Sequence, residues 1–285
     1  FGAPQALENT NPALSLGTSL YSYDMAWAAA NRLWVTSRAG HSSGDTPNLA
    51  DVGPRGAALV TLGGKGGIAQ KTRYVHVAKN PDDVGGLPSS EVTGVEVASD
   101  GSAWLICGLE RAFPTPYDRH VGEPYLFDGE PRPGGIARVA PDGTLEVVAD
   151  GAVVPDARAG ALDPSARLWV LDAQRGLLRQ DGKDWTPVAT GAPADAFPFS
   201  LWVGANGERV AGFDQGARVR LGDADRWLTG MGHVWTAFAR GSGQVLMGSD
   251  DGLVIVRTPD SAPLEESAPA QGFAPPFQSI PAMKP

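Results

Sequence analysis

Three aspartates recur at positions where carboxylates could hold a metal ion. Asp172, Asp214 and Asp250 each follow a mostly apolar run and precede a short turn that ends at a glycine. Carboxylate oxygens are the ligands that Ca²⁺ and Mg²⁺ prefer, so three of them around one rim could bind a divalent cation. An aspartate at this position can also cap its own turn by accepting backbone N–H groups. The sequence leaves both interpretations open.

The histidines could act as general bases or as metal ligands. His233 stands at the start of a largely apolar stretch, whereas His41 and His120 lie in polar stretches and could equally make local hydrogen bonds. The sequence contains no His-Glu-x-x-His or Cys-x-x-Cys spacing. Catalysis by these histidines would therefore require the fold to bring them together.

A repeated unit of short strands must position these residues. The stretch "ARLWVLDAQRGLLRQDGKDW", residues 166–185, is typical of three short strands joined by tight turns. Each of five copies has an inner strand, a second strand that carries an apolar marker residue, and a third strand opened by a glycine; a fourth strand follows in four of them. The marker residues are Trp34, Trp104, Trp169, Val210 and Leu246.

The spacing of the copies predicts a β-propeller. The intervals from Trp169 to Val210 and from Val210 to Leu246 are 41 and 36 residues, close to the roughly 40 residues of a four-stranded blade. We expect an all-β, single propeller of five four-stranded blades; six blades and a pair of β-sandwiches are the alternatives. Because the fifth copy lacks a fourth strand, residues 11–19 are expected to supply it and close the ring. The recurring tryptophans would then be core wedges between blades.

The first two copies carry insertions between their second and third strands, at residues 38–55 and 109–134. These loops should share one face of the propeller, and long loops on a rigid frame are where function concentrates. Alternatively, they are two solvated loops whose histidines only make local hydrogen bonds. The candidate ligand-binding or partner-binding residues in them are Arg38, His41, Arg111, Tyr117, Asp118, Arg119 and His120.

Composition excludes several classes of function. The net charge of −9 and the isoelectric point near 4.9 argue against a nucleic-acid partner. No apolar run approaches the roughly 18 residues of a membrane-spanning helix. Cys107 is the only cysteine and lies in an apolar run, which favours a buried, unreactive thiol. The chain begins with Phe1 and has no signal-like segment, which either processing of a longer precursor or an incomplete sequence would give. Of the two we expect processing, to a periplasmic or secreted protein.

The C-terminal segment differs from the rest of the chain. Residues 259–285 are rich in Pro, Ala and Ser and have almost no hydrophobic periodicity. We therefore divide the chain into a propeller, residues 1–258, and a tail, residues 259–285. The tail is expected to lie on the propeller or on a partner as an extended strap resembling polyproline II.

The stretch "GGIARVAPDGTLEVVADGAVVPDARAGALDPSARLWVLD", residues 134–172, resembles the repeats of gluconolactonase (senescence-marker-protein) and streptogramin-lyase-like propellers. Residues 166–185 also resemble the blades of two-component-regulator propellers. The gluconolactonase resemblance implies a divalent metal held by a Glu and by Asn or Asp residues at inner-strand starts. Glu91 matches the Glu, and Asp156 or Ala157 stands where the relatives have Asn. His233 is similar to the channel histidines of the lyase-like members.

Two functions from different classes follow. The first is a non-catalytic binding or assembly module without a cofactor, which contacts a protein partner through the two insertions and the tail. The alternative is a metal-dependent hydrolase or lyase of the gluconolactonase-like kind, in which His233, Glu91 and Asp156 surround one Ca²⁺ or Mg²⁺ ion. A glycan-binding lectin that uses rim aromatics such as Tyr117 and Tyr125 is a third possibility.

Overall fold

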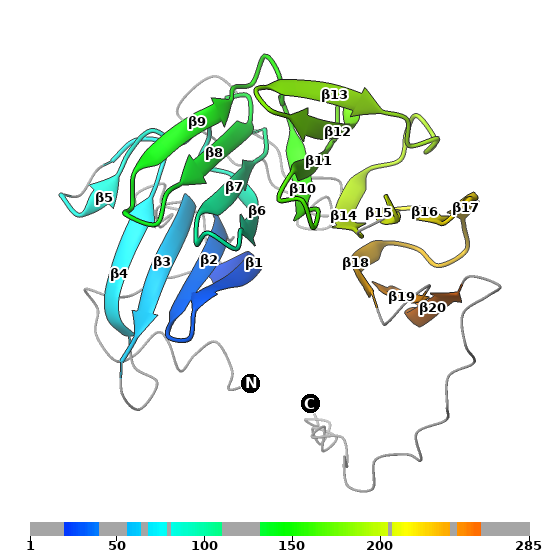
Figure 1. Cartoon of the computed structure of the whole chain (residues 1–285), viewed down its shortest axis with the longest axis horizontal. Helices are drawn as coiled ribbons and strands as arrows, with labels where there is room; N and C mark the ends of the chain where they lie inside the picture. The colour runs from blue at the N-terminus through cyan, green and yellow to red at the C-terminus, as the bar shows by residue number, and fades with distance from the viewer. Residues whose placement is uncertain are drawn as a thin grey trace, which may run out of the picture.

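A computed structural model of the chain describes residues 20–39, 56–63, 68–78, 81–109, 132–204, 207–239 and 244–257. These residues form strands and connecting turns, and none of them belongs to a helix that could cross a membrane. The strands make five sheets, which follow one another in chain order along an arc (Figure 1). The all-β propeller predicted from the sequence is confirmed.

Consecutive strands pair antiparallel in every sheet, and one short parallel strand, β5, is added to the first sheet. The first sheet consists of β1 Leu20–Ala29, β2 Arg32–Ala39, β3 Gly56–Leu62, β4 Ile68–Tyr74 and β5 Asp83–Val84. The second sheet consists of β6 Val92–Val97, β7 Ala103–Cys107, β8 Gly135–Val139 and β9 Leu145–Ala149.

The remaining three sheets repeat this arrangement. The third consists of β10 Ala157–Leu162, β11 Leu168–Asp172, β12 Gly176–Asp181 and β13 Asp184–Val188. The fourth consists of β14 Pro198–Val203, β15 Arg209–Phe213, β16 Gly216–Leu221 and β17 Ala224–Leu228. In the described part of the chain the fifth has three strands, β18 Val234–Ala239, β19 Gln244–Ser249 and β20 Gly252–Arg257.

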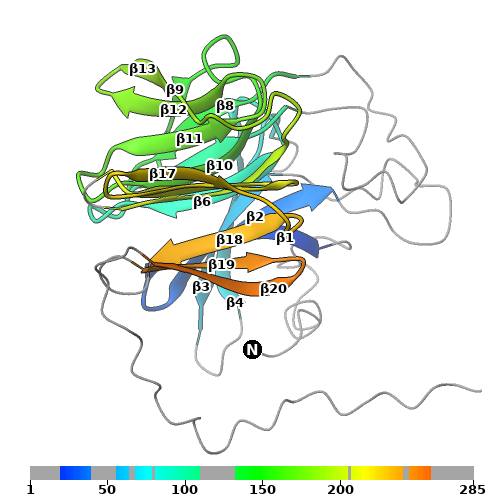
Figure 2. The same cartoon turned by 90° about the vertical axis from the view of Figure 1, so that its right-hand side faces the viewer.

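The first strand of each sheet is its inner strand, and inner strands of successive sheets pack side by side. β1 lies against β6, β6 against β10, β10 against β14, and β14 against β18. Figure 2 shows the last three sheets stacked on one another in this order. The stacking lets each sheet bury one face against the next.

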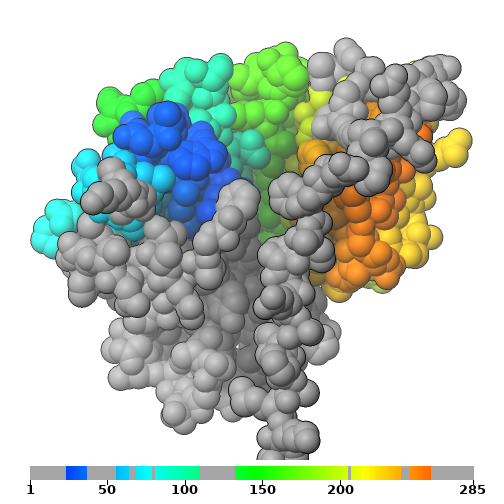
Figure 3. Space-filling view, turned by 90° about the horizontal axis from the view of Figure 1, so that it is seen from below, coloured from blue at the N-terminus to red at the C-terminus, as the bar shows by residue number. Residues whose placement is uncertain are grey.

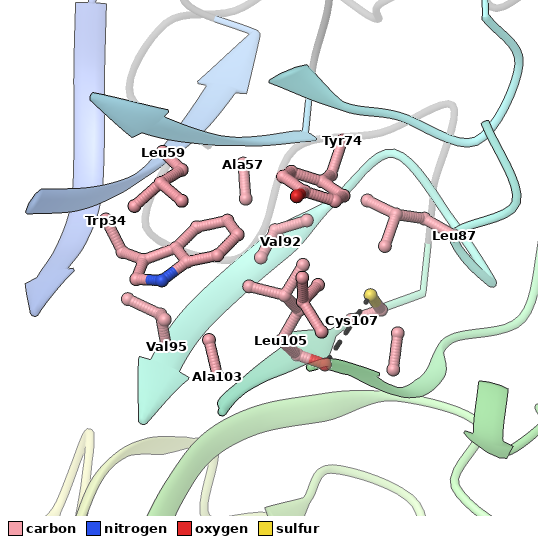
Figure 4. Close-up of a cluster of buried hydrophobic side chains, with 12 residues drawn as sticks. Trp34, Ala57, Leu59, Tyr74, Leu87, Val92, Val95, Ala103, Leu105 and Cys107 are labelled. Carbon is pink, nitrogen blue, oxygen red and sulfur yellow. Dashed lines mark hydrogen bonds between the residues drawn. The ribbon is translucent and has the colours of Figure 1, made fainter. Parts of the chain in front are cut away.

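The recurring tryptophans lie between sheets. Trp34, which is only 2% exposed, packs with Val92 and Leu105 of the second sheet (Figure 4). In the same way Trp104 packs against the third sheet and Trp169 against the fourth. The prediction that these residues are core wedges is confirmed. Cys107 is fully buried, as expected, and burial raises the pKa of its thiol to about 12.

Large exposed apolar side chains are found at both ends of the arc. On β1, Met25 and Trp27 are each 59% exposed, and in the fifth sheet Phe238 and Leu253 are 48% and 63% exposed. Figure 3 shows β1 and β2 in blue and the fifth sheet in orange on opposite sides of the molecule. Among the described residues, β18 and β1 do not pack as the other neighbouring inner strands do.

Several sequence predictions fall outside the described residues. They concern the closing strand 11–19, most of the two insertions, and the tail 259–285. The five-blade count and the closure of the ring therefore stay predictions.

Candidate functional site

Four sheets place an equivalent residue immediately before the inner strand. These residues are Glu91, Asp156, Phe197 and His233, which precede β6, β10, β14 and β18. The backbone carbonyl of each accepts an N–H from the end of the second strand of its own sheet. The donors are Gly108 (2.8 Å), Ala173 (2.9 Å), Asp214 (2.9 Å) and Asp250 (3.2 Å). The expectation from the resemblance that Glu91, Asp156 and His233 stand at inner-strand starts thus corresponds to one repeated position.

A β-bulge follows this position in each of the same four sheets. The pairing register shifts there, and the unpaired residue is Thr93, Arg158, Phe199 or Trp235. Bulges redirect side chains and are frequent next to functional sites. We call these two sets of residues together the rim: Glu91, Thr93, Asp156, Arg158, Phe197, Phe199, His233 and Trp235.

The aspartate at the end of β11 holds the backbone of the rim. Oδ2 of Asp172 accepts the backbone N–H of Asp156 at 2.7 Å, and Oδ1 accepts those of Gln174 and Arg175 at 2.8 and 2.9 Å. Burial raises the pKa of Asp172, although the three N–H donors act in the opposite direction. The carboxylate therefore caps its own turn and also fixes the start of β10.

The equivalent aspartates make related contacts. Asp214 accepts the backbone N–H of Phe197 at 2.8 Å. Asp250 accepts the backbone N–H of His233 at 3.0 Å and the indole N–H of Trp235 at 2.7 Å. Its carboxylate also lies 2.5 Å from Nδ1 of the His233 ring. The hydrogen bond from the His233 ring is the main reason that the pKa of Asp250 is lowered to about 2. All three aspartates thus bind the protein itself.

The divalent cation implied by the gluconolactonase resemblance does not fit these residues. Oδ1 of Asp156 lies 2.6 Å from Nη2 of Arg158 and accepts the backbone N–H of Leu109 at 2.9 Å. A guanidinium therefore already neutralises the best candidate ligand. The described part of the chain contains no group of three His, Cys, Asp or Glu side chains placed to hold a metal ion.

The other half of the rim is a continuous aromatic stretch. The rings of Phe197 and Phe199 are 5.4 Å apart, those of Phe199 and Trp235 are 4.8 Å apart, and His233 stacks on Trp235 at 5.0 Å. The guanidinium of Arg158 lies 5.2 Å from the centre of the Phe197 ring. Trp235 is 39% exposed, so this stretch reaches the surface.

This aromatic stretch was not predicted from the sequence. The signal was present in the alternation of "FPF", residues 197–199, and "HVW", residues 233–235, because both begin at the same position of the repeat. Arg158 occupies the corresponding place in "DAR", residues 156–158.

The second insertion begins and ends at the rim. Leu109, its first residue, donates its backbone N–H to Asp156, and Gly134, its last, donates to the carbonyl of Pro155 at 2.7 Å. The first insertion leaves from β2, where the backbone of Arg38 pairs with Tyr21. The side chain of Arg38 lies outside the described part of the structure. The other candidates lie outside it entirely: His41, Arg111, Tyr117, Asp118, Arg119 and His120.

A second unpredicted feature is a carboxyl pair on the inner strands. Oδ2 of Asp24 on β1 accepts the backbone N–H of Val95 on β6 at 2.9 Å, beside Glu96. Burial, together with the nearby Asp24 carboxyl, raises the pKa of Glu96 to about 7. Burial also raises the pKa of Asp24. Neither residue belongs to a motif, so the sequence did not single them out.

Comparisons with known proteins bear on the fold. No protein-family model matches the sequence, and no curated protein matches it. A gluconolactonase from Xanthomonas campestris superposes with a TM-score of 0.50 and 16% identity over 79% of this chain and 68% of its own. The extracellular domain assigned to a hybrid two-component system of Bacteroides thetaiotaomicron gives a TM-score of 0.51 and 16% identity over 83% of this chain and 27% of its own.

The structure of U3-55K gives a TM-score of 0.54 and 11% identity over 84% of this chain and 62% of its own. Identities this low show a shared fold and not a shared activity. The chain therefore has the propeller fold that its repeats resemble, and its function must be argued from the rim.

Proposed function

We propose that the chain is a non-catalytic propeller module that binds a protein partner on its rim. The contact surface would combine the rim with the insertions 38–55 and 109–134 and the tail 259–285. The observation that carries the proposal is the partly exposed aromatic stretch at the rim, where both ends of the second insertion are also attached.

Exposed aromatic residues on a rigid frame favour binding to a protein. Aromatic side chains and Arg are enriched at the centres of protein interfaces, where a few of them carry most of the binding energy. Trp235 and Phe199 are held by neighbouring rings and, for Trp235, by the hydrogen bond to Asp250. The negative net charge supports a protein partner over nucleic acid. An extracytoplasmic location is supported only by the likeness to an extracellular domain.

The alternative function, a metal-dependent hydrolase or lyase, receives less support. It would need Glu91, Asp156 and His233, or the aspartates 172, 214 and 250, to offer oxygen and nitrogen atoms to Ca²⁺ or Mg²⁺. Asp156 is paired with Arg158, and His233 is paired with Asp250. We therefore propose that the module works without a divalent cofactor.

Shortening the second insertion tests the proposal. Residues 110–131 would be replaced by a turn as short as residues 173–175, which make the equivalent connection in the third sheet. The partner is first isolated with the full chain and purified, and its dissociation constant is then measured for both forms. We expect binding at least about tenfold weaker, because part of the contact surface is removed.

A matched control checks that the loss is local. Val147 is an exposed apolar residue on the outer strand β9, away from the rim. Val147→Ser should leave the dissociation constant unchanged. Equal affinity of the full chain and the shortened chain would overturn the proposed contact surface.

A further inference from the structure

Arg158 is a buried cation at the boundary between the polar and the aromatic halves of the rim. It occupies the bulge of β10 and is only 7% exposed. Its Nη2 lies 2.6 Å from Oδ1 of Asp156, but this contact is not aligned as a hydrogen bond. One face of the guanidinium is directed at Phe197.

The guanidinium has hydrogen-bond donors that the described residues do not satisfy. Its Nε is buried and has no acceptor among them. Arg carries five N–H donors and cannot lose its charge, so each buried donor without an acceptor destabilises the folded protein. Asp156 also divides its Oδ1 between Arg158 and the backbone N–H of Leu109. A purely structural ion pair would leave fewer donors unsatisfied.

Unsatisfied buried donors in a native protein indicate a missing acceptor. A carboxylate suits this place best, because its two oxygens match the planar fork of a guanidinium. The adjacent rings of Phe197, Phe199 and Trp235 offer an apolar surface that continues from the guanidinium toward solvent. A ligand that satisfies both features carries a carboxylate next to an apolar ring or chain.

We propose that the rim is a carboxylate-binding site in which Arg158 holds the carboxylate and Phe199 and Trp235 hold the apolar group beside it. This inference rests on the rim being the binding surface proposed above. The carboxylate belongs either to an acidic side chain of the partner or to a small organic acid, and the chemistry of recognition is the same for both.

Two isosteric probes test the site without any partner. Phenylacetate carries a carboxylate next to a ring, and phenylacetamide is its neutral counterpart. Binding is followed by the NMR signal of the Trp235 indole N–H, which is assigned among the eight tryptophans by its loss in Trp235→Phe. We expect phenylacetate to shift this signal saturably at millimolar concentration and phenylacetamide to bind at least about tenfold more weakly, since charged hydrogen bonds are about twice as strong as neutral ones.

Two variants separate recognition from folding. Arg158→Lys keeps the charge and loses the planar fork, so phenylacetate should bind about tenfold more weakly. The double variant Asp156→Asn/Arg158→Gln removes both charges together and should bind the two probes equally. Unfolding midpoints of both variants are measured to confirm that they fold. Equal affinity of the parent chain for the two probes, or unchanged phenylacetate binding by Arg158→Lys, would overturn the proposal.

Competition with the partner identifies the source of the carboxylate. If phenylacetate displaces the purified partner, the carboxylate belongs to the partner. If it binds and does not displace the partner, the site takes a small organic acid. Either result supports the carboxylate-binding site. If no partner complex forms but phenylacetate still binds, the proposed function is wrong and the carboxylate-binding site stands.

Discussion

Glu96 is the residue whose ionisation state should matter most for stability. It lies on the inner strand β6 beside Asp24 of the neighbouring sheet, and its pKa of about 7 is well above the ordinary value of 4.5. A carboxyl whose pKa is raised on folding stabilises the native state only while it is protonated. This contribution is complete below about pH 4.5 and is lost as the pH rises through 7.

Glu96→Gln should therefore flatten the dependence of stability on pH. Between pH 5 and 8 the parent chain should lose up to about 3 kcal/mol of unfolding free energy through this one group. The variant should lose correspondingly less, as measured by urea unfolding at each pH. Glu146→Gln on the outer strand, where the side chain is exposed, serves as the control. Parallel pH profiles for Glu96→Gln and the parent would contradict this account.

At the residue scale, the sequence located the positions of several site residues but not the partners of their side chains. Counting within the repeat placed Asp172, Asp214 and Asp250 at strand ends, where the structure has them. It could not show that Asp250 would pair with His233, or that Asp156 would pair with Arg158. Such pairs depend on how far a bulge turns a side chain and on the packing of the next sheet, and neither is specified by spacing along the chain.

Among the elements, the third strands explain the recurring glycine. Gly216 opens β16 with a φ of 138°, and a Cβ there would overlap the carbonyl oxygen of Leu228 on β17. Gly176 opens β12 with a φ of 74°, but no atom lies within 4 Å of the place a Cβ would take. The recurring glycine therefore has two physical causes. At Gly176 only the backbone conformation requires it, whereas at Gly216 the close approach of β17 also leaves no room for a Cβ.

Alanine substitutions should distinguish the two causes. Gly176→Ala should cost about 1–2 kcal/mol of unfolding free energy, because only the left-handed conformation is penalised. Gly216→Ala should cost at least about 3 kcal/mol, since the added methyl group must also displace β17. Both values come from denaturant unfolding. A cost for Gly176→Ala as large as that for Gly216→Ala would refute the role of close approach.

The existence and order of the strands were predictable because a 40-residue period and buried markers are long-range signals that many residues share. The bulges were not predictable, because one extra residue in an inner strand changes neither composition nor alternation enough to be recognised. The short parallel strand β5 was missed for a related reason: two residues, Asp83 and Val84, carry no periodicity.

For the whole molecule, the open question is how the arc is closed. Leu246 occupies the marker position of the fifth sheet, and in the other four sheets this position is packed against the next sheet. Phe238, which pairs with Leu246, and Leu253 are left exposed on the fifth sheet. In the described residues β20 pairs only with β19, so its outer edge remains available for a further strand.

The prediction that residues 11–19 supply this strand can be tested by hydrogen exchange. In the full chain, alternate amides of β20 should be protected by the added strand, and deletion of residues 1–19 should make them exchange rapidly. Amides of β17, the outer strand of the fourth sheet, should not change. Fast exchange of all the β20 amides that point away from β19, already in the full chain, would show that residues 11–19 do not pair there.

The central claim is that the rim binds a partner, and the dissociation constant of the purified complex measures it most directly. Trp235→Ser, combined with the shortened second insertion, should weaken the complex by at least about a hundredfold, whereas Val147→Ser should leave it unchanged. An unchanged dissociation constant in the combined variant would contradict the claim, and one tightly bound divalent cation per chain would then favour the metal-dependent enzyme.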